Sequence, residues 1–189
     1  ARLVHLGRPW APLSSYDLIV TTPQYNLPRQ SNIQHNSLPL HNHDADALSR
    51  EAAALAPRLA ELPCPRIAVL LGGDSGKFVF TAEKGRRLGH LAETLARSSS
   101  GSIVLTSSPR TPEAAVTACV DAITAPAFVH RWSVAAANPY AGILGSADAF
   151  IVTGESMSML AEASAPGKPL YIFDMADDPA VPWWRHAHA

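Results

Sequence analysis

The chain has 189 residues, of which 47% are hydrophobic and 16% charged, a composition that indicates a folded globular protein and excludes extensive disorder. The 15 Lys and Arg residues nearly balance the 16 Asp and Glu residues, so no basic field indicates a nucleic-acid partner. No apolar stretch approaches the ~18 residues that span a bilayer, and the N-terminus lacks the apolar core of a signal peptide. We therefore expect a cytoplasmic protein.

Two short apolar runs near the start predict strands, "RLVHL" (2–6) and "YDLIVTT" (16–22). The segment 22–44 is rich in Pro, Asn, Gln and His and has no hydrophobic period, so we predict a loop or interdomain linker there. Residues 45–62 are rich in Ala and predict a helix. A second domain is expected to begin with the strand that follows, near residue 67.

From residue 67 to residue 173, strand-like runs alternate with helical patterns. The strands are expected at "RIAVLLGG", "SIVLTSS", "AFVHRW", "DAFIVTG" and "PLYIF", and the helices at 81–98, 112–123, 139–147 and 157–165. This alternation predicts an α/β fold with a Rossmann-like parallel sheet covered by helices on both faces. Thr111 and Asn138 each precede a proline, which favours helices that cap on these residues and carry Pro at the first position.

Polar, partly glycine-rich segments follow three of these predicted strands. Gly72 to Gly76, "GGDSG", fit neither the Walker loop nor the GxGxxG motif. "TSSPRTP" (106–112) and "TGES" (153–156) follow two other strands. Because open α/β sheets bind ligands at the carboxyl ends of their strands, we expect the three loops to meet at one edge and to contact a phosphate group. A purely structural turn at the glycines is the alternative, and for Arg110 a solvent-facing side chain stays equally open.

The helix expected at 157–165 carries candidate ligand groups on one face. Ser156 is a favourable N-cap, because its hydroxyl can accept an N–H of the first turn. Ser158 and Glu162 are four residues apart and share a face, where Glu162 could accept hydrogen bonds from a ribose diol. A solvated Glu is the ordinary alternative.

The sequence contains no motif that is specific for a metal site or for a catalytic nucleophile. "HNHD" at 41–44 stands at a predicted helix start, where Asp is favoured for capping alone. Cys64 and Cys119 are isolated, so they indicate neither a disulfide framework nor a zinc site. No Ser-His-Asp or Cys-His arrangement can be assembled. We predict no metal and no cofactor, and we assign no catalytic residue.

Four stretches resemble, in order and over most of the chain, the mitochondrial-fission Elm-like family and its bacterial relatives. They are "LGRPWAPLSSYDLIVTTPQYNLP", "LLGGDSGKFVFT", "TSSPRTP" and "NPYAGILGSADAFIVTGESMSMLAEASAPGKPLYIF". Those relatives are commonly described as nucleoside-diphosphate-sugar epimerases or glycosyltransferases. The resemblance implies a GT-B-like architecture, in which two Rossmann-like domains face a cleft and the C-terminal domain binds a nucleotide-sugar donor.

In that architecture the diphosphate lies near Gly-rich loops and a helix N-terminus, and a helix Glu often holds the ribose. The family usually has Ser-Arg-Arg-Thr where this chain has Ser108-Pro109-Arg110-Thr111, which puts a two-Arg phosphate clamp in doubt. The candidate site for the nucleoside-diphosphate sugar comprises Gly72, Gly73, Asp74, Ser75, Ser107, Ser108, Arg110, Thr111, Asn138, Tyr140, Thr153, Glu155, Ser156, Met157, Ser158 and Glu162. Of these, Gly72, Gly73, Ser156, Met157 and Glu162 match the places that the resemblance implies.

The resemblance also implies a division of the chain. Residues 1–45 would be the end of an N-terminal Rossmann-like domain with its linker, 46–66 a connecting helix, and 67–189 the nucleotide-sugar-binding domain. The chain begins without Met in a strand-like run, so we expect a piece of a longer protein, whose missing parts could contact a membrane peripherally. The leading hypothesis is the donor domain of a GT-B-type glycosyltransferase. A noncatalytic adaptor of the same fold and a nucleoside-diphosphate-sugar epimerase are the alternatives.

Overall fold

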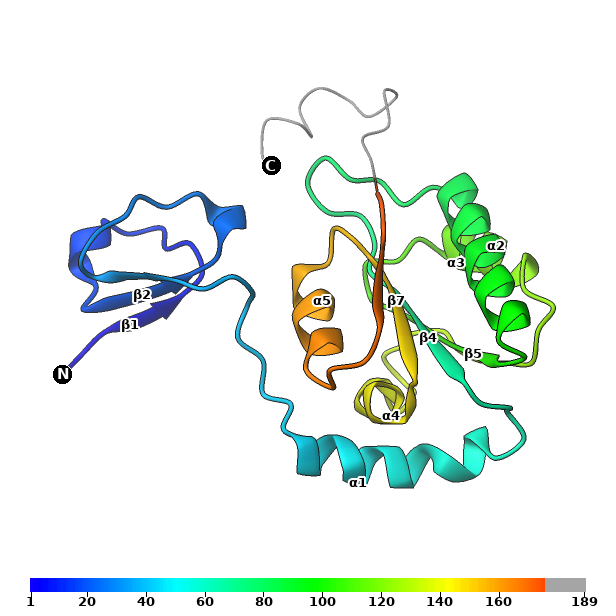
Figure 1. The fold of residues 1–189 in the computed structure, drawn as a ribbon. Helices are drawn as coiled ribbons and strands as arrows, with labels where there is room; N and C mark the ends of the chain where they lie inside the picture. The colour runs from blue at the N-terminus through cyan, green and yellow to red at the C-terminus, as the bar shows by residue number, and fades with distance from the viewer. Residues whose placement is uncertain (176–189) are drawn as a thin grey trace. The chain divides into compact units, whose positions relative to one another are not determined.

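The structure, a computed structural model, describes residues 1–175 of the chain (Figure 1). The chain divides into two compact units, residues 1–41 and 42–189. Each unit contains a parallel β-sheet, and helices cover both faces of the larger sheet, so the predicted α/β fold with a Rossmann-like parallel sheet is confirmed. Within residues 1–175 no helix combines the length and the hydropathy that crossing a membrane requires.

The first unit is a three-stranded parallel sheet in the order β1-β2-β3. Its elements are β1 (Val4–Leu6), a 3-10 helix η1 (Leu13–Ser15), β2 (Leu18–Thr21), a 3-10 helix η2 (Pro23–Tyr25) and β3 (Ile33–His35). The prediction of a loop throughout 22–44 was wrong for β3. This strand has three residues and only Ile33 is buried, so the sequence shows no alternation there, and pairing with β2 creates the strand.

The second unit is built on a five-stranded parallel sheet in the order β6-β5-β4-β7-β8. All five strands were predicted: β4 (Arg66–Leu71), β5 (Ser102–Ser107), β6 (Ala127–His130), β7 (Ala149–Thr153) and β8 (Leu170–Phe173). The chain runs outward from β4 through β5 to β6 and then returns to β7 on the other side of β4. The carboxyl ends of β4 and β7 therefore form a topological switch point, where open α/β sheets bind ligands.

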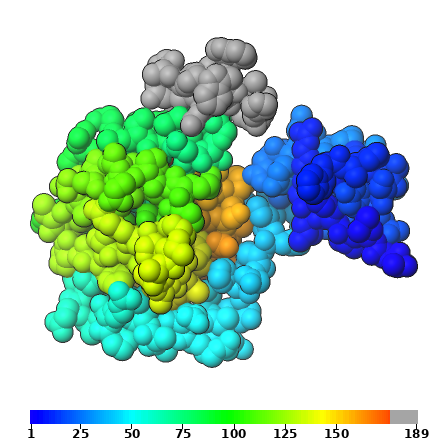
Figure 2. Space-filling view, turned by 180° about the vertical axis from the view of Figure 1, so that it is seen from behind, coloured from blue at the N-terminus to red at the C-terminus, as the bar shows by residue number. Residues whose placement is uncertain are grey.

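Helices cover both faces of the five-stranded sheet (Figure 1). On one face lie α2 (Ala82–Ser98) and α3 (Glu113–Asp121), and on the other α1 (Ala45–Leu55), α4 (Tyr140–Ser146) and α5 (Met157–Ser164). In Figure 2 the cyan surface of α1 adjoins the yellow surface around α4, against which α1 packs. Val69 of β4 joins the core under α2 and α3, and Leu70 joins the opposite core. Burial on both faces explains why β4 reads as a continuous apolar run.

Several helix ends differ from the prediction. The helix predicted over 45–62 ends at Leu55 and continues as a 3-10 turn, η3 (Ala56–Leu59), because Pro57 has no N–H for the α-helical hydrogen bond. Pro112 and Pro139 occupy the N-cap positions of α3 and α4, one residue before the helical position expected for them.

Candidate functional site

The loops that follow β4, β5 and β7 meet at the carboxyl edge of the five-stranded sheet, as the sequence predicts. The N–H of Gly72 donates to the buried hydroxyl of Thr153 at 2.8 Å. The carbonyl oxygen of Gly72 accepts hydrogen bonds from the hydroxyls of Ser108 and Thr111. Gly72 therefore ties the end of β4 to the ends of both neighbouring strands.

Glycine is required at positions 72 and 73 because other groups approach the backbone closely. A Cβ at Gly72 would lie 1.9 Å from Oε1 of Glu155, and a Cβ at Gly73 would lie 2.1 Å from the carbonyl oxygen of Arg110. These contacts come from segments of the protein itself. They agree with the alternative interpretation of the glycines as a structural turn.

The four backbone amides from Gly72 to Ser75 all donate hydrogen bonds within the protein. Besides Gly72, the N–H of Gly73 donates to Oε1 of Glu155 at 2.6 Å. The N–H of Asp74 donates to the carbonyl oxygen of Arg110 at 3.2 Å, and that of Ser75 to the carbonyl oxygen of Phe78 at 3.0 Å. A phosphate group would have to displace one of these acceptors in order to bind the turn through its amides.

Among these acceptors, Glu155 contributes a side-chain carboxylate that accepts more than one hydrogen bond. Its Oε1 also accepts a hydrogen bond from the Thr153 hydroxyl, at 3.2 Å. Its Oε2 is buried and has no hydrogen-bond partner among residues 1–175. A buried carboxylate oxygen without a partner is destabilising, because the water that it loses is not replaced.

The loop after β5 brings a cation to the same turn. The exposed guanidinium of Arg110 donates through Nη1 to the carbonyl oxygen of Asp74 at 3.1 Å, and no carboxylate within residues 1–175 pairs with it. The Thr111 hydroxyl was predicted to cap the helix that follows, but it bridges loops instead. It accepts the N–H of Ser108 at 2.8 Å and donates to the carbonyl oxygen of Leu71 at 3.0 Å.

Two other predicted residues of these loops have partners that hold the backbone. A carboxylate oxygen of Asp74 accepts the N–H of Phe80 at 2.9 Å, close to the start of α2. The hydroxyl of Ser107 accepts the N–H of Trp132 at 2.9 Å and so joins the ends of β5 and β6. Both side chains therefore shape the loops.

The start of α5 lies beside Gly72, since a Cβ there would come within 2.9 Å of the Ser156 Cβ. Ser156 occupies the N-cap position, but its side chain makes no capping hydrogen bond, so the predicted hydroxyl cap was wrong. Ser156 has φ −95° and ψ 80°, whereas an N-cap residue that caps through its side chain typically has extended backbone. The first turn of α5 thus has no side-chain acceptor from Ser156. Met157 packs against the core, and Ser158 is exposed.

Three further residues form a polar cluster between α1, α4 and α5. The Tyr140 hydroxyl donates to Oε2 of Glu162 at 2.7 Å, and Nε2 of His43 lies 3.8 Å from Oε1 of Glu162. Burial raises the pKa of the Tyr140 phenol, and the hydrogen bond to Glu162 and its negative charge raise it further. Oδ1 of Asn138 accepts the N–H of Tyr140 at 3.1 Å and fixes the start of α4. Asn138, Tyr140 and Glu162 are thereby brought together.

Sequence reasoning missed His130, at the carboxyl end of β6. Its Nδ1 lies 3.1 Å from the Thr106 hydroxyl, and its Nε2 is buried with no hydrogen-bond partner among the described residues. Burial, followed by the positive charge of Arg58, lowers the pKa of His130 below its usual value and so disfavours the protonated ring. The only sequence feature that could have indicated His130 is its position as the polar residue at the end of the apolar run "AFVH".

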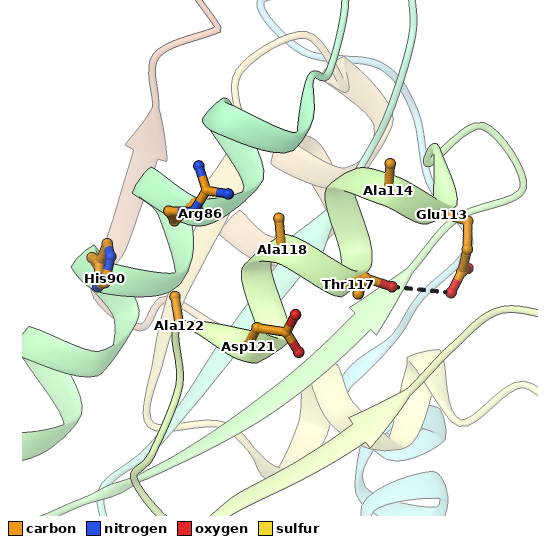
Figure 3. A pocket seen from close by; sticks show the side chains of 8 residues that line it. All are labelled: Arg86, His90, Glu113, Ala114, Thr117, Ala118, Asp121 and Ala122. Atoms are coloured by element: carbon orange, nitrogen blue, oxygen red, sulfur yellow. Dashed lines mark hydrogen bonds between the residues drawn. The ribbon is translucent and has the colours of Figure 1, made fainter.

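One pocket formed by the described residues lies between α2 and α3 (Figure 3). It has a volume of about 530 Å³ and is lined by Arg86 and His90 of α2 and by Glu113, Thr117 and Asp121 of α3, with alanines between them. None of these residues belongs to the predicted site. Within residues 1–175, no group of three His, Cys, Asp or Glu side chains could hold a metal ion.

Comparison with known proteins gives two curated relatives. The chain is 31% identical over 146 residues to "Mitochondrial fission protein ELM1" of Arabidopsis thaliana, an alignment that covers 77% of this chain and 34% of that protein. It is 30% identical over 108 residues to an uncharacterized protein of Rickettsia prowazekii (strain Madrid E), covering 56% of this chain and 30% of that protein. The alignments thus span about a third of the length of these relatives.

Among solved structures, the chain is similar to the crystal structure of POFUT1 in complex with GDP, with a TM-score of 0.45 and 13% identity. That alignment covers 75% of this chain and 54% of POFUT1. The sequence pattern of the family described as Mitochondrial fission ELM1 matches residues 1–188, nearly the whole chain. The chain therefore belongs to the Mitochondrial fission ELM1 family.

Proposed function

We propose that the second unit is the donor-binding domain of a GT-B-type glycosyltransferase and holds a nucleoside-diphosphate sugar at the carboxyl edge of its sheet. One observation carries the proposal: two sources of positive potential flank the same turn at the switch point. They are the start of α5, which Ser156 does not cap, and the Arg110 guanidinium, which pairs with no carboxylate within residues 1–175. Helix N-termini and guanidinium groups both favour phosphate binding in proteins.

The proposed ligand position follows from this arrangement. The diphosphate would lie over the ends of β4 and β7, between α5 and Arg110, and the ribose would reach toward Glu162 on the face of α5 that also carries Ser158. During transfer, an acceptor hydroxyl would lose its proton and its oxygen would bond to the anomeric carbon of the sugar, while the bond between that carbon and the diphosphate oxygen breaks. The dipole of α5 and the charge of Arg110 would then stabilise the negative charge that develops on the leaving diphosphate.

A noncatalytic adaptor is the second candidate, and the closed turn favours it. All four amides from Gly72 to Ser75 have acceptors inside the protein, so the turn is complete without a ligand. An adaptor that keeps this fold for binding a partner needs no nucleotide.

Calorimetric titration of the chain with UDP, GDP, ADP and CDP separates the two candidates. The glycosyltransferase proposal expects one of these diphosphates to bind with a Kd well below about 1 mM, and expects pyrophosphate to compete with it. If none of the four binds, the proposal is rejected in favour of the adaptor. A thermal unfolding curve of the same sample serves as the control for folding.

A further inference from the structure

The carboxylate of Glu155 occupies the place at the Gly72–Ser75 turn that an anionic ligand would take. Backbone N–H groups in a glycine-rich turn at the end of a strand form a concave site for anions. Here Oε1 of Glu155 accepts the N–H of Gly73 at 2.6 Å, and it lies where any side chain at position 72 would begin. The turn thus already binds an anion, and that anion belongs to the protein.

Only one of the two carboxylate oxygens of Glu155 accepts hydrogen bonds from the described residues. Oε1 has two donors, the Gly73 N–H and the Thr153 hydroxyl, whereas Oε2 is buried and has no donor within the described part of the chain. A phosphate group presents more oxygens to the same donors, and it would also meet the Arg110 guanidinium, whose partner in the turn is the neutral carbonyl of Asp74. The arrangement therefore favours exchange of Glu155 for a phosphate.

We propose that Glu155 is an internal competitor for phosphate at the Gly72–Ser75 turn. In the closed turn its carboxylate holds the Gly73 amide, and a phosphate group binds there only when this carboxylate moves out. The proposal deepens the proposed function and rests on it, since the phosphate would belong to the nucleoside diphosphate. It gives Glu155 a role opposite to ligand contact: the residue weakens anion binding and holds the turn closed in the free protein.

Inorganic pyrophosphate tests this role, because it carries no base, ribose or sugar. The affinity of the chain for pyrophosphate is measured by calorimetry at constant ionic strength for the wild type, Glu155→Gln and Glu155→Ala. Both substitutions remove the like charge beside the turn, and Gln retains an oxygen that can accept the Gly73 N–H. We expect both variants to bind pyrophosphate at least tenfold more tightly than the wild type.

Glu61→Gln is the matched control, because it removes the same charge from an exposed position ahead of β4, at the amino end of the sheet. It should change the affinity by less than about twofold, since bulk water and salt screen charges at that separation. Adding Arg110→Ala to Glu155→Gln should remove most of the gain. Equal or weaker binding by both folded Glu155 variants would overturn the proposal, and so would an equal gain in the Glu61 control.

If the Glu155 variants fail to fold, nuclear magnetic resonance of the wild type tests whether pyrophosphate replaces the Glu155 carboxylate at Gly73. Exchange of the carboxylate for pyrophosphate should shift the amide resonance of Gly73, whereas the amide of Ser75, bonded to Phe78, should shift less. No shift at Gly73 under saturating pyrophosphate would overturn the proposal. A wild type that binds a nucleoside diphosphate, together with Glu155 variants that gain nothing for pyrophosphate, would reject this inference and leave the proposed function standing.

Discussion

At the scale of single residues, two glutamates near α5 have different surroundings. Glu155 lies at the carboxyl edge, where one of its oxygens accepts hydrogen bonds and the other has no partner within residues 1–175. Glu162 lies on α5, where Tyr140 donates to one oxygen and His43 lies near the other. The sequence suggested ligand contact for both. Both residues are partly buried, but Glu155 accepts hydrogen bonds from Gly73 and Thr153 of its own loops, whereas Glu162 accepts one from Tyr140 of α4.

Glu162→Gln tests the expected contact with ribose. The substitution keeps the size and helix propensity of the side chain and removes its charge, so thermal unfolding should be nearly unchanged. The affinity for the nucleoside diphosphate that binds best should fall by about 1.5–3 kcal/mol, or roughly tenfold to more than a hundredfold, as expected for a hydrogen bond to a charged group. Calorimetry on the wild type and the variant measures the difference.

Tyr140→Phe is the companion variant. It removes the hydroxyl that donates to Glu162 at 2.7 Å but leaves the carboxylate in place. We expect it to lower stability by about 1 kcal/mol and to change nucleotide affinity by less than about threefold. If Glu162→Gln binds the nucleotide as tightly as the wild type does, Glu162 does not contact the ligand.

At the scale of elements, Glu93 of α2 fastens the segment before β6. Its Oε2 accepts the N–H groups of Thr124 and Ala125, both at 2.9 Å, and its Oε1 accepts the Thr124 hydroxyl at 2.6 Å. The hydrogen bond from the Thr124 hydroxyl, followed by that from the Ala125 amide, lowers the pKa of Glu93 from 4.5 to about 2. The Glu93 carboxylate thus accepts backbone N–H groups of this loop, as an N-cap side chain accepts the N–H groups at the start of a helix.

The pH dependence of stability tests this attachment. Because the folded state holds Glu93 ionised, its contribution is complete above the unfolded pKa of 4.5 and disappears as the pH falls through about 2. We expect Glu93→Gln to lower the free energy of unfolding by about 1–2 kcal/mol near neutral pH, and the difference from the wild type to shrink over that acidic window. Urea unfolding at a series of pH values measures both.

Glu83→Gln is the matched control on the same helix. The side chain of Glu83 is 78% exposed and pairs only with Arg86 within the described residues, so its loss should change stability by less than about 0.5 kcal/mol. A Glu93→Gln penalty that stays constant from neutral pH down to about pH 2 would show that the lost contacts do not depend on the charge.

The elements of the second unit were predictable from sequence because their signals are local. β4, β5 and β7 are continuous apolar runs, and Thr81 caps α2 through the N–H of Lys84, as its position suggests. β3 was missed because three residues with one buried side chain leave no period to detect. Whether such a short segment forms a strand depends on its pairing with a neighbouring strand, which the sequence does not show.

The position of the candidate site was predictable from the sequence, but the contacts within it were not. Parallel strands must end at one edge, so the meeting of the three loops followed from the order of strands and helices. The partners within the site did not follow, because Gly72 and Thr153 are 81 residues apart in sequence, and the Gly73 amide could have faced a ligand as readily as Glu155. These tertiary contacts of the turn cannot be read from the sequence.

At the scale of the whole molecule, the two units differ in how much apolar surface they bury. Within the first unit only two hydrophobic side chains are buried, Ile19 and Ile33, and Val4 and Leu6 of β1 are 54% and 62% exposed. The second unit contains two buried clusters, one on each face of its sheet. Since burial of apolar surface is the main term that opposes chain entropy, the first unit should open at a much lower free energy than the second.

Hydrogen exchange followed by mass spectrometry or nuclear magnetic resonance measures this difference on the intact chain. The amides of β2 should exchange at least about a hundredfold faster than those of β4 and β5, which corresponds to a gap of about 2.7 kcal/mol in opening free energy. In increasing urea, protection of β2 should vanish before protection of β4 changes, since the two sheets share no strand. Equal protection of β2 and β4, lost together at one urea concentration, would mean that the two units unfold as one cooperative body and that the small core of the first is stabilised by more than its own contacts.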